Sequence, residues 1–291
     1  MFSLKVDLIK GNILKSLLIF AIPIFISYIF QQLYNTMDTM IVGNFLGDTS
    51  LAAIGACGAV YELLVGFALG IGNGLSIVTA RNYGSGNKEL LKKSVAGSIV
   101  IGIMVTVAIM IISKLFLYSL LEGLNTPENI IDESYSYIYM IILFVGVMFA
   151  YNLCAGLLRA IGNSIMPLVF LIISSALNIG LDILFITQFN MGIKGAAIAT
   201  VISQGISAIL CLIYICKKAP ILIPSKEHFA FDKVLYKELL GQGLSMGFMG
   251  AIVSAGTVIL QTAINNLGYL IIAGHTAARK LNSFCMMPGA T

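Results

Sequence analysis

The chain has 291 residues, of which 58% are hydrophobic and only 10% are charged, and its formal net charge is +4. An ordinary soluble domain carries about 25% charged residues, so this chain has too little charge to coat a globule in water. The composition excludes a soluble enzyme, a disordered chain and a nucleic-acid-binding protein. It predicts an integral membrane protein whose main partner is the lipid bilayer.

Long apolar segments, rather than short alternating ones, favour a helical bundle over a β-barrel. A membrane-spanning helix needs roughly 20 apolar residues. The sequence therefore predicts an all-α integral membrane protein. Its helices are expected at residues 14–45, 51–80, 91–121, 134–158, 166–188, 195–216 and 239–264, with a last one from residue 270 that the chain end cuts short.

The basic residues indicate an orientation in the membrane. Thirteen Lys and Arg residues fall in segments on one side of the predicted bundle, and only Lys114 and Lys194 fall on the other. Because basic loops stay in the cytoplasm, we expect the N-terminus to be cytoplasmic. The expected location is the cell membrane (plasma or inner), which the chain would cross several times.

The longest polar segment follows the sixth predicted helix and divides the chain. We expect an N-terminal six-helix lobe over 1–218, a cytoplasmic linker over 219–238, and the start of a C-terminal lobe over 239–291. An offset of 221 residues aligns 44–47 (NFLG) with 265–268 (NNLG), where a parallel repeat would place them. The chain would then hold one lobe and the first two helices of a second, pseudo-symmetric lobe that is truncated.

Three acidic residues, Asp38, Glu62 and Asp182, fall inside predicted helices. An ionisable side chain at the bilayer centre costs about 2.5–3.5 kcal/mol on insertion scales, so such residues are functional by default. The alternative is a structural polar contact between helices. For Glu62, near the predicted midplane, a cationic substrate or a coupling ion is the natural partner.

Oxygen-bearing side chains from four predicted helices fall at similar depth in the outer half of the first lobe, by a rise of about 1.5 Å per residue. Carboxylates, an amide carbonyl and hydroxyls suit a desolvated hard cation. The same carboxylates suit a proton, because burial disfavours their charged form. We therefore expect a site for a coupling cation, with Na⁺ and H⁺ both open. Its residues would be Tyr34, Asp38, Tyr139, Asn178, Asp182 and Thr200.

Three further residues enter the predicted mechanism. Pro23 removes a backbone hydrogen bond within the first helix, which permits a hinge there, although a purely structural proline is the alternative. Arg279 and Lys280 lie about ten residues into the last helix, which is nearly three turns at 3.6 residues per turn. They either pair with a carboxylate or face a central cavity. We assign Glu62 and Lys280 to a substrate cavity.

Several stretches resemble the multidrug and toxic compound extrusion (MATE) family over residues 10–288. They are AIPIFISYIFQQLYNTMDTMIVGNFLG, GIGNGLSIVTARNYGSGNKE, LLRAIGNSIMP, SALNIGLDILFI, MGIKGAAIATVISQ and TAARKLNSFCMMP. The resemblance implies two six-helix lobes in a V shape, alternating access, and export of organic cations against a Na⁺ or H⁺ gradient. It also implies a cation site, which Asp38, Asn178, Asp182 and Thr200 would form. The family's proline in the first helix is matched by Pro23.

The leading hypothesis is a cation-coupled antiporter that exports small organic cationic or amphipathic compounds and is a monomer when full length. One alternative is a flippase for lipid-linked precursors on the related two-lobe plan, which predicts a cationic cavity because its substrates carry phosphates. Another is a truncated fragment that does not transport. We expect no enzyme, because no nucleophile–base pair or phosphate loop is present. Apart from Na⁺ at the coupling site, we expect no metal or cofactor.

Overall fold

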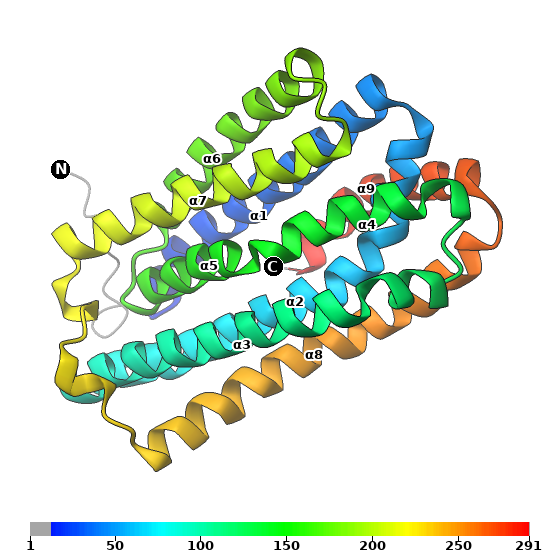
Figure 1. The fold of residues 1–291 in the computed structure, drawn as a ribbon. Helices are drawn as coiled ribbons and strands as arrows, with labels where there is room; N and C mark the ends of the chain where they lie inside the picture. Colours follow the sequence, from blue (N-terminus) through cyan, green and yellow to red (C-terminus); the bar gives the residue numbers. More distant parts are fainter. Residues whose placement is uncertain (1–12, 291) are drawn as a thin grey trace.

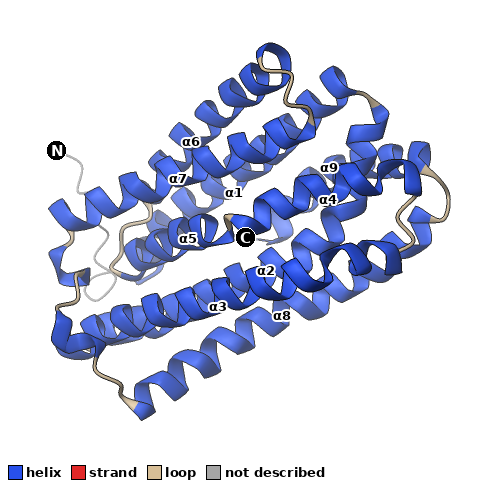
Figure 2. Ribbon diagram, viewed as in Figure 1, coloured by secondary structure: helices blue, strands red, loops and turns tan. Residues whose placement is uncertain are grey.

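The computed structural model describes residues 13–290, with side chains over 15–282, and these residues form a bundle of helices (Figure 1). Within this range no strand occurs, and short loops join the helices (Figure 2). The main helices are α1 (Ile13–Leu46), α2 (Asp48–Gly84), α3 (Lys88–Gly123), α4 (Glu128–Leu143), α5 (Val145–Ala160), α6 (Ile165–Ile183), α7 (Ile193–Lys218), α8 (Lys233–Asn265) and α9 (Tyr269–Ala290).

Six helices of the described chain are long and apolar enough to cross a membrane, namely α1, α2, α3, α6 with its continuation, α7 and α8. The number rises to 7 if the bent pair α4 and α5 is counted as one span. Their lipid-facing surfaces carry exposed large side chains such as Ile103, Met104 and Leu115. The chain is therefore a multi-pass helical membrane protein.

The predicted helix over 134–158 is wrong in one respect, because two helices meet there at an angle of 50°. Phe144 has φ −112° and ψ 21°, outside the helical region, and its N–H bonds to Ile141 O instead of continuing the regular ladder. The first of the two helices also begins earlier than predicted, at Glu128. The bend lies beside the central cavity, which residues from both α4 and α5 line.

The chain alternates between the two ends of the bundle, so its basic residues gather at one of them. The α2–α3 and α5–α6 turns and the linker before α8 lie at one end, and the α1–α2, α3–α4, α6–α7 and α8–α9 turns lie at the other (Figure 1). Lys114 lies in the half of α3 that leads to the second group of turns, and Lys194 lies in the first turn of α7. Lys5 and Lys10, part of the predicted basic side, lie outside the described residues. Which end faces the cytoplasm stays a prediction.

The α2 helix runs through the centre and packs against α8, α5, α3, α9 and α4. Its contact with α8 depends on glycines in both helices. A Cβ at Gly70 would lie 2.9 Å from Gly247 Cα, and one at Gly74 would lie 2.7 Å from Gly243 Cα. The two backbones approach closely because these residues lack side chains, as is common in membrane helix pairs.

Between α7 and α8 the chain forms two short 3-10 helices, η2 (Pro220–Leu222) and η3 (Lys226–Phe229). The α8 helix starts at Lys233, earlier than the predicted residue 239, because Asp232 caps it by accepting hydrogen bonds from Val234 N and Leu235 N at 3.1 and 3.2 Å. The predicted linker therefore contains the first turn of α8. The division into two lobes remains a prediction.

Candidate functional site

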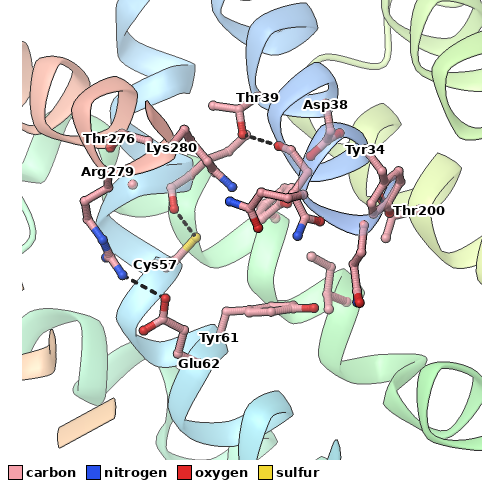
Figure 3. A pocket seen from close by; sticks show the side chains of 18 of the residues that line it. Tyr34, Asp38, Thr39, Cys57, Tyr61, Glu62, Thr200, Thr276, Arg279 and Lys280 are labelled. Atoms are coloured by element: carbon pink, nitrogen blue, oxygen red, sulfur yellow. Dashed lines mark hydrogen bonds and ion pairs between the residues drawn. The ribbon is translucent and has the colours of Figure 1, made fainter. Parts of the chain in front are cut away.

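A cavity of about 340 Å³ lies at the centre of the bundle and is lined by residues of α1, α2, α4, α5, α7, α8 and α9. Six residues singled out from the sequence line it, namely Tyr34, Asp38, Glu62, Thr200, Arg279 and Lys280. Lys280 approaches from one side of the view, and Asp38, Tyr34 and Thr200 lie on the other (Figure 3). The structure thus brings residues from four helices to one cavity.

Asp38 and Asp182 meet where α1 packs against α6. Tyr34 and Asp38 lie one turn apart on α1, and both are 7% exposed. Asp182 is completely buried, and its carboxyl group lies close enough to the Asp38 carboxyl group for the two to interact. Two carboxyl groups that are shielded from water therefore face each other at the edge of the cavity.

A short hydrogen-bond network joins these carboxyl groups to α7. The Asn178 side-chain amide lies one turn before Asp182 and donates to Asp182 Oδ1 and to Thr200 Oγ1, both at 3.4 Å. The Tyr34 hydroxyl donates to Thr200 Oγ1 at 3.2 Å. Asn178 and Asp182 do not themselves line the cavity, so they form a buried layer behind Tyr34, Asp38 and Thr200.

Three acceptor oxygens of this cluster are buried and have no hydrogen-bond donor among the described residues. They are Asp38 Oδ1, Asp182 Oδ2 and Asn178 Oδ1. A buried acceptor without a donor costs about 1–3 kcal/mol, and more if it is charged. A proton on a carboxyl group, or a hard cation among the oxygens, would satisfy such atoms. These oxygen atoms therefore fit either of the two coupling ions considered from the sequence, Na⁺ or H⁺.

Tyr139, the sixth residue predicted for the cation site, is not brought to the cluster. Its ring stacks on Tyr135 with centroids 5.5 Å apart, and it does not line the cavity. Tyr137 lines the cavity instead and is 8% exposed. Side chains two residues apart on a helix point about 200° apart, so Tyr137 and Tyr139 lie on nearly opposite faces of α4. The structure therefore places Tyr137, and not Tyr139, on the face of α4 that lines the cavity.

The α1 helix continues without interruption through Pro23 from Ile13 to Leu46. Ser27 Oγ donates to Pro23 O at 2.7 Å, one turn further along. Pro23 has no N–H to complete the bond to the residue four positions before it, so the helix is weaker there. The hinge remains a prediction.

Asp182 stands directly before an irregular turn. The α6 helix ends at Ile183 and continues as a π-helical turn, η1 (Leu184–Gln188), in which Phe189 N bonds to Leu184 O at 3.2 Å. Such turns occur frequently at functional sites. The sequence predicted one continuous helix over 166–188, because nothing in its composition marks the change of hydrogen-bond spacing.

Glu62 has partners on two other helices. Its Oε1 lies 2.8 Å from Arg279 Nη2 on α9, and its Oε2 accepts a hydrogen bond of 2.9 Å from Thr257 on α8. The side chains of Glu62 and Arg279 are 40% and 31% exposed. Of the two alternatives left open for Arg279, the structure therefore shows both, because it pairs with a carboxylate and lines the cavity.

Several residues that line the cavity were not among those expected from the sequence. Gln204 lies one turn after Thr200 and shares its face, so helical spacing could have indicated it. Tyr61 and Tyr137 also line the cavity, but half-buried and buried tyrosines are common in packed cores, and sequence offers no signal that separates them. Thr257 meets Glu62 only because α8 packs on α2.

Carboxyl groups in and beside a central cavity, within a bundle of long apolar helices, define the chain as a polytopic membrane protein. The family model described as MatE matches residues 23–184, more than half of the chain. The chain belongs to this family, whose members are transporters, and the resemblance noted in the sequence is confirmed.

Known relatives align with nearly the whole chain. It is 28% identical over 286 residues to the "Probable multidrug resistance protein YpnP" of Bacillus subtilis (strain 168), covering 97% of this chain and 63% of that protein. It is 29% identical over 289 residues to YoeA of the same organism, another probable multidrug resistance protein, covering 97% and 62%. The chain therefore spans less than two thirds of the length of these relatives.

Solved structures share the fold. The chain superposes on a structure titled "Crystal structure of MATE in the bent conformation" with a TM-score of 0.83 and 25% identity, covering 97% of this chain and 63% of that one. An outward-facing multidrug resistance MATE transporter gives a TM-score of 0.86 at 24% identity, covering 98% and 63%. The predicted fold class, an all-α MATE-like membrane protein, is confirmed.

Proposed function

We propose that the chain forms the larger part of a cation-coupled antiporter, driven by Na⁺ or H⁺, that exports small organic cationic or amphipathic compounds, drugs among them. The names of its two Bacillus subtilis relatives, both probable multidrug resistance proteins, support this substrate class. We further propose that the basic end of the bundle faces the cytoplasm, that the membrane is the cell membrane, and that the full-length protein acts as a monomer.

The observation that carries the proposal is the set of three buried acceptor oxygens without donors, on Asp38, Asn178 and Asp182. Acceptors alone cannot satisfy one another, so the cluster is stabilised by a species that brings positive charge or a proton. If the cation or proton enters from outside the cell, its binding couples the ion gradient to ligand binding in the cavity. This coupling is direct because Asp38 both belongs to the cluster and lines the cavity.

Coupling then follows from differential affinity. A cation or proton at Asp38 removes negative charge from the cavity wall, which lowers the affinity for an organic cation there, and the reverse also holds by linkage. Tyr34 and Thr200 tie α1 to α7 beside this carboxyl group, so a change of its charge acts on the contact between two helices. The gradient drives export by binding one conformation better than the other.

The test uses cells that lack other efflux systems and express the native gene, including any sequence beyond residue 291. Asp38→Asn and Asp182→Asn should each lower ion-driven efflux of a permanently cationic dye at least tenfold, while the protein still reaches the membrane. Asp132→Asn, which changes an exposed carboxylate on α4, serves as the matched control and should export like wild type. Normal efflux by both aspartate variants would refute the proposed coupling.

A flippase for lipid-linked precursors is the second candidate, and one observation favours it. Arg279 and Lys280 both line the cavity, as a phosphate-bearing substrate would require. Asp38 and Glu62 on the same cavity oppose it, because they repel phosphate. Binding measurements with rhodamine 6G and with a polyprenyl phosphate distinguish the two, since the antiporter should bind the dye and the flippase the phosphate.

A further inference from the structure

Glu62 is attached to both helices that follow the linker. Its carboxylate on α2 binds Arg279 on α9 at 2.8 Å and accepts a hydrogen bond from Thr257 on α8 at 2.9 Å. The α9 helix can come this close to α2 because Gly55 lacks a side chain, since a Cβ there would overlap Thr276. The ion pair thus sits at a contact that close helix packing creates.

The ion pair is also open to the cavity. Glu62 and Arg279 both line it, and their side chains are 40% and 31% exposed (Figure 3). Among the residues whose side chains the structure describes, the charged ones in the lining are two carboxylates, Asp38 and Glu62, and two cations, Arg279 and Lys280. The formal charges of this lining cancel. An organic cation therefore finds no excess of negative charge in the cavity unless one of the two side-chain cations moves away.

We propose that Arg279 is a specificity-determining residue that competes, as a tethered cation, with cationic ligands for the carboxylate of Glu62. This inference rests on the proposed function, of which it specifies one binding contact. A ligand cation that reaches Glu62 replaces the Arg279 guanidinium, and Thr257 keeps the carboxylate oriented during the exchange. Only ligands that bind Glu62 better than Arg279 does are retained, which selects against weakly interacting cations.

The same exchange connects ligand binding to helix movement. The Glu62–Arg279 pair joins α2 to α9, and a ligand that takes the place of Arg279 removes this tie. A ligand can shift a conformational equilibrium only by binding one state better than another. Loss of the Glu62–Arg279 ion pair provides such a difference in affinity, because the ligand binds Glu62 only in conformations in which Arg279 on α9 has released the carboxylate.

The test is fluorescence polarisation of rhodamine 6G, a permanently cationic dye, with the purified full-length protein. Arg279→Gln should tighten dye binding about 5-fold, the scale of a partly exposed ion pair of about 1 kcal/mol. In the E62Q background the same substitution should tighten binding less than 2-fold, because the carboxylate that Arg279 guards is gone. Nile red, a neutral dye, should bind Arg279→Gln and wild type equally.

Lys280→Gln is the matched control, since it removes a neighbouring cation that lines the same cavity. Its effect should depend on Glu62 less than that of Arg279→Gln does, because among the described residues Arg279, and not Lys280, forms the ion pair with Glu62. Equal gains from Arg279→Gln in both backgrounds, or no gain in either, would overturn the inference. If Arg279→Gln does not fold, Arg279→Lys decides, because the more strongly hydrated ammonium should hold Glu62 less well and still give tighter dye binding than wild type. Unchanged or weaker binding by Arg279→Lys would likewise overturn it.

These outcomes separate the inference from the proposed function. If wild type binds rhodamine 6G and Arg279→Gln shows no gain, only the role of Arg279 is lost. If neither wild type nor any variant binds the dye, the substrate class proposed above falls together with the inference.

Discussion

The Tyr34 hydroxyl on α1 donates a hydrogen bond of 3.2 Å to Thr200 Oγ1 on α7, across 166 positions of sequence. Both residues are buried, at 7% and 6% exposure. Thr200 in turn accepts from Asn178, which also contacts Asp182. One threonine hydroxyl therefore joins three helices around the two facing carboxyl groups, and its surroundings offer the most direct tests of the site.

Removing the Tyr34 hydroxyl should destabilise the protein. Tyr34→Phe deletes a buried hydrogen bond, so we expect a loss of about 1 kcal/mol, seen as a lower midpoint of thermal unfolding in detergent. Tyr139→Phe is the control, because that ring stacks on Tyr135 away from the cavity. Equal shifts for the two variants would contradict the placement of Tyr34, and not of Tyr139, in the network.

The close approach of α2 and α8 should not tolerate a methyl group. Gly74→Ala places a Cβ against the backbone of Gly243, so we expect destabilisation of about 1–3 kcal/mol by overpacking. Gly66→Ala on the same helix meets nothing within 4 Å and should be neutral, or stabilising by up to about 1 kcal/mol through helix propensity. Thermal unfolding of the two variants side by side measures the difference. Similar behaviour of both would mean that the helices are not in contact at Gly74.

His228 should hold the segment between α7 and α8 in place. Its Nδ1 accepts from Ser225 N at 3.0 Å, and its Nε2 lies 3.2 Å from a carboxylate oxygen of Glu89 on α3. His228→Ala removes both contacts, together worth about 1 kcal/mol because Glu89 is largely exposed, so trypsin should cut after Lys226 about 5-fold faster. Phe229→Ala changes an exposed side chain further from the cleaved bond and should leave the cleavage rate unchanged. Unaltered cleavage of His228→Ala would show that other contacts hold the segment.

Pro23 provides a test of the predicted hinge. Pro23→Ala restores a backbone N–H inside α1, so the helix should gain up to about 3 kcal/mol and the unfolding midpoint should rise. If bending at this position is part of transport, dye efflux should fall at the same time. Ile22→Ala, at an exposed neighbouring position, should change neither quantity. A stabilised variant with wild-type efflux would exclude a hinge at Pro23.

Hydropathy and charge determined the class of protein, because a bilayer admits long apolar helices whose backbone groups are satisfied internally. Helix spacing also placed Tyr34 with Asp38, and Asn178 with Asp182, since residues four apart share a face. The sequence does not show which face of a helix points toward the other helices. Tyr139 was therefore predicted for the site, whereas Tyr137 lines the cavity. The break at Phe144 also carried no sequence signal, as no proline stands there.

Only the tertiary structure decided that Glu62 pairs with Arg279, whereas depth along the helices had already grouped Asp38 with Asp182. Asp38 and Asp182 are separated by 144 positions, and Glu62 and Arg279 by 217, yet each pair lies together in the fold. Periodicity gives the direction of a side chain relative to its own helix axis and says nothing about the neighbouring helix. The partner of a buried charge depends on how helices pack, and glycines such as Gly55 and Gly74 set that packing by allowing two backbones to touch.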